Sequence, residues 1–116
     1  MAFDEQLAER VRVALTHRQD LDERRMFGGI AFMLGGHMAC GIVGSDLMLR
    51  LGPEAADAAL AKPHVRPMDF TGRPMRGMVY VAADGVRTAP QLRRWVGAAA
   101  AYVDALPPKP GPRRPA

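Results

Sequence analysis

A pair of glycines between two apolar segments constrains the fold more than any other feature. Gly35-Gly36 separates residues 25–34 from residues 38–43, and both segments are rich in apolar side chains. Two adjacent glycines can both adopt the positive φ angles that a two-residue hairpin turn requires. We therefore expect two antiparallel strands. The pairing expected from this turn is Leu34 with His37, Met33 with Met38 and Ala31 with Cys40.

Three further strands are expected after this hairpin. Gly44-Ser45-Asp46 predicts a turn into residues 47–51, where leucines alternate with Met48 and Arg50. Residues 65–70 are predicted as an edge strand, because Pro67 has no N–H to donate to a second neighbour. Residues 75–82 alternate again and predict the fifth strand.

Helical patterns lie before, between and after these strands. Residues 4–17 are amphipathic, with Asp4 placed to cap the helix, and residues 54–61 predict a short alanine-rich helix. The third helix begins at a capping box formed by Thr88 and Gln91. The charged stretch 19–23 has no apolar period and is predicted as a connector. The apolar stripe of the last helix consists of Leu92, Trp95, Val96, Ala99, Tyr102, Val103 and Leu106.

The expected order of elements is α-β-β-β-α-β-β-α. Strands joined mainly by tight turns favour an antiparallel sheet, so we predict an α+β two-layer sandwich with five strands and helices on one side. A chain of 116 residues is long enough for one such core. Residues 1–106 are expected to form this single domain. Residues 107–116 contain five prolines and are expected to be a disordered tail.

Charge, cysteine content and the absence of long apolar runs indicate in which cellular compartment the protein is located. The 16 Lys and Arg exceed the 12 Asp and Glu by four, but three of these cations lie in the acid-free tail, so the domain itself is nearly neutral. The N-terminus lacks the pattern of a secretory signal, and no apolar run reaches the roughly 20 residues of a membrane span. With Cys40 as the single cysteine, no intramolecular disulfide is possible. We expect a cytoplasmic protein that does not enter the membrane.

Groups suited to catalysis or metal binding are scarce. His37 and Cys40 supply two ligands where a zinc site usually has about four, and a separation of three residues along a strand predicts opposite faces. Gly28-Gly29 leads into a strand rather than a helix, so it predicts a bulge or a close approach between the backbone and a helix instead of a phosphate loop. The remaining carboxylates are dispersed. We therefore expect no catalytic residue, no cofactor and no metal ligand.

Arginines on the strands are the candidate binding residues. A sheet face that carries several arginines and a tyrosine can bind a phosphate, a carboxylate or single-stranded nucleic acid, although solvated surface is the simplest role for each one. Phe27, Phe32 and Trp95 are expected to be buried, which leaves few aromatic rings for stacking on bases. The many methionines predict core packing or an adaptable surface for a partner. The candidate residues are Arg24, Arg25, Arg50, Arg73, Arg76 and Tyr80.

The chain resembles the N-terminal domain of the TfoX/Sxy competence regulators over about residues 4–106. The distinctive block is Arg25-Met26-Phe27-Gly28-Gly29 in front of the glycine hairpin, supported by Gly72-Arg73-Pro74-Met75 and Leu92-x-x-Trp95-Val96. The resemblance implies a two-layer α+β fold similar to secretion chaperones. It also implies a bacterial cytoplasmic regulator of DNA-uptake genes that acts with a transcription factor rather than by catalysis. Regulators of this family carry a second helical domain, so this sequence is expected to be a stand-alone copy of the first.

Three functions follow from these features. The first is a non-enzymatic regulatory domain that contacts a protein partner or a second copy of itself, as in a homodimer. The second is direct nucleic-acid binding through the strand arginines and the basic tail. The third, and least favoured, is a small enzyme acting on an anionic substrate.

Overall fold

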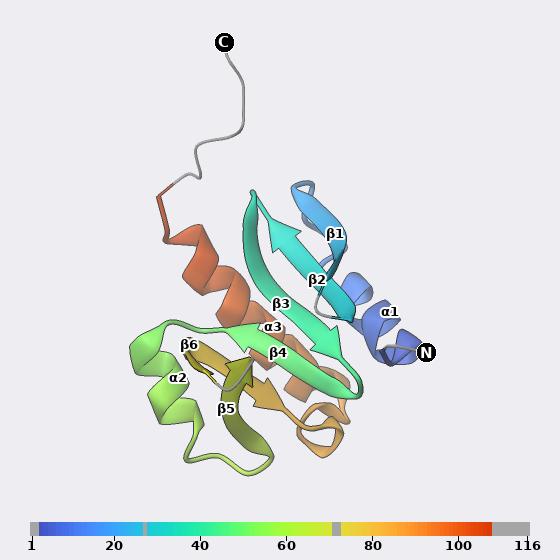
Figure 1. Ribbon diagram of the computed structural model, residues 1–116. Helices are drawn as coiled ribbons and strands as arrows, with labels where there is room; N and C mark the ends of the chain where they lie inside the picture. The colour runs from blue at the N-terminus through green and yellow to red at the C-terminus, as the bar shows by residue number, and fades with distance from the viewer. Residues whose placement is uncertain (1–2, 27, 71–72, 108–116) are drawn as a thin grey trace.

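A six-stranded antiparallel sheet forms one layer of the molecule, and helices cover one of its faces (Figure 1). The computed structural model describes residues 3–26, 28–70 and 73–107. The strand order is β1-β2-β3-β4-β6-β5, and every neighbouring pair is antiparallel. The strands are β1 (Leu21–Met26), β2 (Gly29–Leu34), β3 (His37–Val43), β4 (Asp46–Arg50), β5 (Val65–Phe70) and β6 (Arg73–Val81). The predicted α+β class is confirmed, with six strands in place of five.

The helices begin where the sequence predicts them. In α1 (Glu5–Ala14) the Asp4 carboxylate accepts a hydrogen bond from the Leu7 amide at 3.1 Å. In α3 (Ala89–Asp104) the predicted capping box is present, with hydrogen bonds in both directions between Thr88 and Gln91. The shorter α2 is Pro53–Ala59, and a single 3₁₀ turn, η1 (Ala83–Val86), precedes α3.

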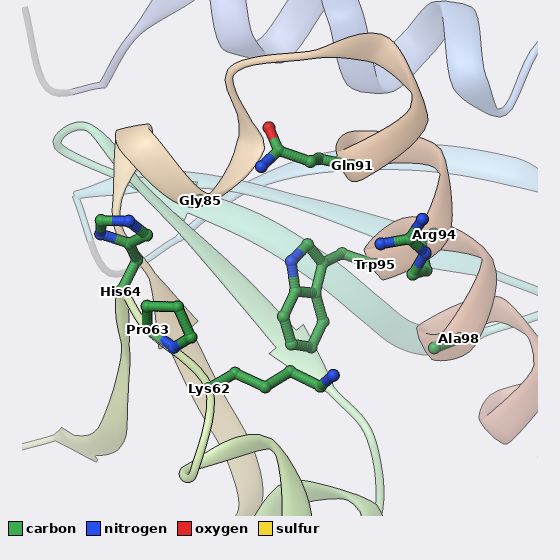
Figure 2. Close-up of a pocket in the computed structure, with 8 residues that line it drawn as sticks. All are labelled: Lys62, Pro63, His64, Gly85, Gln91, Arg94, Trp95 and Ala98. Carbon is green, nitrogen blue, oxygen red and sulfur yellow. The ribbon is translucent and has the colours of Figure 1, made fainter.

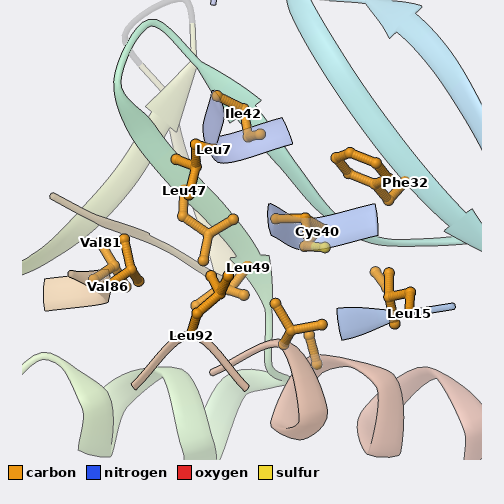
Figure 3. Close-up of a cluster of buried hydrophobic side chains, with 14 of the residues drawn as sticks. Leu7, Leu15, Phe32, Cys40, Ile42, Leu47, Leu49, Val81, Val86 and Leu92 are labelled. Atoms are coloured by element: carbon orange, nitrogen blue, oxygen red, sulfur yellow. The ribbon is translucent and has the colours of Figure 1, made fainter. Parts of the chain in front are cut away.

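The main core lies between the sheet and α1 and α3, with two alanines of α2 at its margin (Figure 3). Each strand contributes the side chains of one face, because successive residues of a strand point to opposite sides. The largest fully buried side chain is that of Phe32 on β2. Other members of this core are Leu7, Val11, Ile42, Leu47, Leu49, Val79, Val81, Val86, Leu92 and Val103.

The predicted connector at residues 19–23 is wrong, because most of it belongs to β1. This strand pairs with β2 along its whole length, from Leu21 opposite Leu34 to Met26 opposite Gly29. Four of its six side chains are charged, which suits an edge strand. Glu23 forms an ion pair with Arg12 of α1 at 2.7 Å. Charged side chains on an edge strand also disfavour pairing with other chains. This strand could not be recognised by an alternation of apolar residues, because its sequence has none.

A β-bulge changes the predicted register of the glycine hairpin. Leu34 lies opposite His37 and Met33 opposite Met38 as predicted, but the register then shifts. Phe32 rather than Ala31 pairs with Cys40, which leaves Ala39 as the extra residue of β3. The shift places His37 and Cys40 on the same face of the sheet, contrary to the prediction of opposite faces.

The other edge strand is β5, as the proline within it predicts. Pro67 lies opposite Val79, and a register shift follows between Pro67 and Asp69. Since β5 pairs only with β6, the missing N–H leaves no neighbouring carbonyl without a partner.

Methionines form a second, smaller cluster on the helix-free face. Met48, Met68 and Met78 are buried there, with the half-buried Met38 and Tyr80 packed against them. The methionines of this face thus mainly pack against one another, and they bury apolar surface on a face of the sheet that no helix covers. Only the outermost members of the cluster remain available to a partner.

Candidate functional site

The candidate arginines do not converge on one site. Arg24 and Arg25 lie on β1, at one edge of the sheet, whereas Arg76 lies on β6, four strands away. Strands are spaced about 4.8 Å apart, so these groups are separated by roughly 19 Å. Arg50 ends β4, and its guanidinium lies 5.8 Å from the ring centre of Tyr102 on α3. The side chain of Arg73 lies outside the described part of the structure.

Several of these groups already have partners within the chain. Arg24 forms an ion pair with Asp22 at 3.3 Å, and Arg25 lies over the ring of Phe3 at 5.5 Å. The half-buried Tyr80 carries the guanidinium of Arg66 over its ring at 4.7 Å. Arg66, which the sequence analysis did not select, also forms an ion pair with Asp46 at 2.6 Å.

The distinctive block at residues 25–29 forms the end of β1, a turn and the start of β2. Phe27 lies outside the described residues, and for Met26 only the backbone is described. Gly28 adopts a positive φ of 74° in the turn, whereas Gly29 approaches the backbone of Ile42 on β3. Gly29 thus makes a close approach, but to a neighbouring strand rather than to the helix that was predicted, and the block is structural.

One row of side chains crosses the helix-free face from edge to edge. Residues that face each other in neighbouring antiparallel strands project to the same side, so the strand registers define this row. Its central members, Ala31, Gly41 and Met48, are buried, and the methyl group of Met48 lies over Gly41. The row consists of Arg24, Ala31, Gly41, Met48, Tyr80 and Arg66. We call it the cross-sheet row.

A pocket of about 350 Å³ lies on the other side of the molecule, between α3 and the loop that follows α2 (Figure 2). Trp95 stands at its centre, with the side chain of Lys62 running beneath the indole ring in this view. The pocket is lined by Lys62, Pro63, His64, Gly85, Gln91, Arg94, Trp95 and Ala98. We call it the Trp95 pocket.

This pocket was not predicted from the sequence, and Trp95 was expected to lie in the core. The indole is half-buried: it packs against the core cluster and also lines the pocket. A signal was present, because residues 91, 94, 95 and 98 follow the i, i+3, i+4, i+7 spacing of one helix face. The opposite wall, residues 62–64, has no such signal because it meets α3 only in the folded chain.

The thiol of Cys40 is fully buried on the core face of β3, and burial raises its pKa to about 12. Burial disfavours the charged thiolate, which is the reactive form. His37, on the same face, instead lies 3.0 Å from the carbonyl oxygen of Pro107. Within the described residues these two side chains therefore do not form a nucleophile–base pair.

We expect Cys40 to react with a thiol reagent only when the chain unfolds. The folded pKa lies above the ordinary value of about 8.5, so the neutral thiol favours folding at pH below about 8.5. Stability is then lost progressively as the pH rises towards about 12. Labelling with Ellman's reagent at pH 8, with and without denaturant, measures how far the fold protects the Cys40 thiol from the reagent. Fast labelling of the native protein would contradict it.

The described residues contain neither a metal-binding cluster nor a membrane-spanning helix. No group of three or more His, Cys, Asp or Glu side chains there is placed to hold a metal ion. Among the helices of residues 3–26, 28–70 and 73–107, none has the length and apolar character that crossing a membrane requires.

Comparison with known proteins identifies the family. The TfoX N-terminal domain family matches residues 13–102, which include all six strands and most of α3. No curated protein and no solved structure matches the chain. Because the family match covers well over half of the 116 residues, the chain belongs to the TfoX N-terminal domain family.

Proposed function

We propose that this domain is a non-enzymatic binding module of a cytoplasmic regulatory protein and that it acts by contact with another protein. Membership of the TfoX N-terminal domain family is the observation that carries the proposal. The resemblance to competence regulators supports a role in transcriptional control beside a transcription factor in a bacterial cell. The fully buried, unpaired thiol of Cys40 is in keeping with a reducing cytoplasm.

The cross-sheet row is the surface that we assign to this contact. Its middle is apolar and, apart from the half-buried Tyr80, buried, and an arginine lies at each end, on β1 and β5. Protein interfaces commonly combine an apolar centre rich in Met and Tyr with a polar rim that includes Arg. The partner that fits is a protein with an apolar side chain for the half-buried Tyr80 and carboxylates for Arg24 and Arg66.

Charge placement favours protein contact over nucleic-acid binding. Each cation that reaches a phosphate strengthens binding to a nucleic-acid backbone, whereas the arginines of the described strands are spread over β1, β4, β5 and β6. The basic residues of the tail lie outside the described part of the chain.

Charge reversal tests this proposal. The tagged full chain is used to capture partner proteins. Each captured protein is purified, and its affinity for the chain is measured by calorimetry. Sedimentation of the full chain alone tests whether the partner is a second copy. We expect Arg24→Glu and Arg66→Glu to weaken the contact by about tenfold each, the effect of losing one charged hydrogen bond. Arg93→Glu, an equal charge change on exposed α3 surface, should leave it unchanged.

Two results would refute the proposal. One is a chain that is monomeric at all concentrations and binds no purified partner. The other is binding to duplex DNA that depends on base sequence, in place of the salt-sensitive and sequence-independent attraction expected from a basic tail.

A further inference from the structure

The Trp95 pocket has the size of a small-molecule site. Such sites have volumes of about 300–1,000 Å³ and combine apolar walls with a few polar groups. At about 350 Å³ this pocket lies at the lower end of that range. Its occupant would therefore be small, with about one ring.

The titratable side chains that line the pocket are two cations, Lys62 and Arg94, and one histidine, His64. Lys62 lies on the loop after α2 and Arg94 on α3, and no Asp or Glu is among the lining residues. Neither Lys62 nor Arg94 forms an ion pair with any residue of the described chain. Two cations without a carboxylate between them favour an anionic ligand.

Gln91 adds a hydrogen-bond donor of known orientation. Its amide oxygen accepts hydrogen bonds from the backbone N–H and the hydroxyl group of Thr88, at 2.9 and 3.2 Å. The amide nitrogen must therefore point away from Thr88, and Figure 2 shows it on the pocket side of the residue. The capping box thus fixes a donor towards the pocket, which again suits a ligand that accepts hydrogen bonds.

Trp95 and Pro63 supply the apolar surface of the pocket. The indole is exposed in part, although its neighbours in the apolar stripe of α3, Leu92 and Val96, are buried. An aromatic ring with one accessible side favours a flat apolar partner, because stacked or edge-to-face rings attract each other. A planar ring therefore suits this wall better than a branched aliphatic group.

The loop that faces Trp95 is held in an unusual backbone conformation. His64 is the one non-glycine residue with a positive φ, 70°, in the described part of the chain. Its carbonyl oxygen accepts a hydrogen bond from the Ala82 amide at 2.8 Å, and a Cβ on Gly85 would lie 3.1 Å from the Cβ of His64. Contacts with Ala82, which follows β6, and with Gly85 of η1 thus fix the loop on the side of the pocket that faces α3. Backbone strain of this kind is concentrated at binding and switch regions.

We propose that the Trp95 pocket binds a small aromatic carboxylate. The ring lies against Trp95 and Pro63, and the carboxylate accepts hydrogen bonds from the donors of Lys62 and Arg94. This site is separate from the cross-sheet row, since it lies on α3 and the loop after α2, and its occupancy does not depend on protein contact.

Trp95 is the single tryptophan of the sequence, so its indole N–H gives one assignable resonance in ¹H–¹⁵N spectra of the full chain. The probes are benzoate, the neutral analogue benzamide, and acetate as an anion without a ring. We expect benzoate to shift this resonance saturably in the millimolar range and to raise the melting temperature. Benzamide and acetate should bind about tenfold more weakly, since each lacks one of the two recognised features.

Matched variants locate the site. Lys62→Gln and Arg94→Gln are exposed substitutions, so the variants should fold, and each should weaken benzoate binding by about tenfold. Arg93→Gln removes the same charge from the adjacent position of α3, outside the Trp95 pocket, and should have no effect. The proposal is overturned if benzoate gives no saturable shift, if benzamide or acetate binds equally well, or if the three variants behave alike.

Discussion

Replacing Gly29 with alanine will destabilise the fold by about 3 kcal/mol or more, while the same change at the preceding residue, Gly28, will destabilise it by only about 1–2 kcal/mol. A Cβ on Gly29 would lie 2.0 Å from the carbonyl oxygen of Ile42 on the neighbouring strand. This oxygen belongs to the backbone, so no rotamer change can relieve the clash, and β2 must move away from β3. The hydrogen bonds of the central sheet would be distorted.

Gly28 provides the matched control because it is glycine for a different reason. Its φ is +74°, but a Cβ there would meet no atom within 4 Å. The penalty at Gly28 is therefore only that of a left-handed backbone for an L-residue. Denaturant titration of both variants, followed by circular dichroism, measures the difference. If Gly28→Ala proves the more damaging of the two, the close approach of β2 and β3 at Gly29 is not what stabilises this part of the sheet.

Truncating Phe32 to alanine is the second change with a large expected effect, about 3–5 kcal/mol. The ring is completely buried on the core face of β2, opposite Cys40. Its removal loses the transfer free energy of the ring and leaves a cavity that the surrounding sheet can fill only in part. A domain of this size is typically stable by about 5–15 kcal/mol, so the variant will be close to unfolding.

Val13→Ala is the control for the truncation of Phe32. Val13 is also apolar, but it lies on α1 with 65% of its surface exposed, and surface changes usually stay within about 0.5 kcal/mol. Thermal melts of both variants at the same pH make the comparison. Equal losses of stability would show that the core is not centred on Phe32.

The local elements were predictable because their signals lie close together in the sequence. Gly35-Gly36 indicates its hairpin, Thr88 and Gln91 indicate the start of α3, and Pro67 indicates an edge strand. Each signal acts through a backbone geometry that involves only a few neighbouring residues. The structure contains all three features.

The candidate site was less predictable. The arginines were selected by strand position, but whether they meet depends on strand order, and the order places β1 and β6 four strands apart. Trp95 was assigned to the core because its spacing in α3 matches the apolar stripe. Its partial exposure depends on how closely residues 62–64 approach α3, and helix periodicity does not report that distance.

The sequence by itself determined the class of the fold, the glycine hairpin, the helix caps and the family, because these depend on short-range patterns. Only the tertiary structure decided the charged sixth strand, the bulge at Ala39, the buried methionine cluster and the pocket at Trp95. Each of these features depends on which distant segments pack together. Their packing minimises exposed apolar surface and clashes over the whole chain, so no short stretch of sequence encodes it.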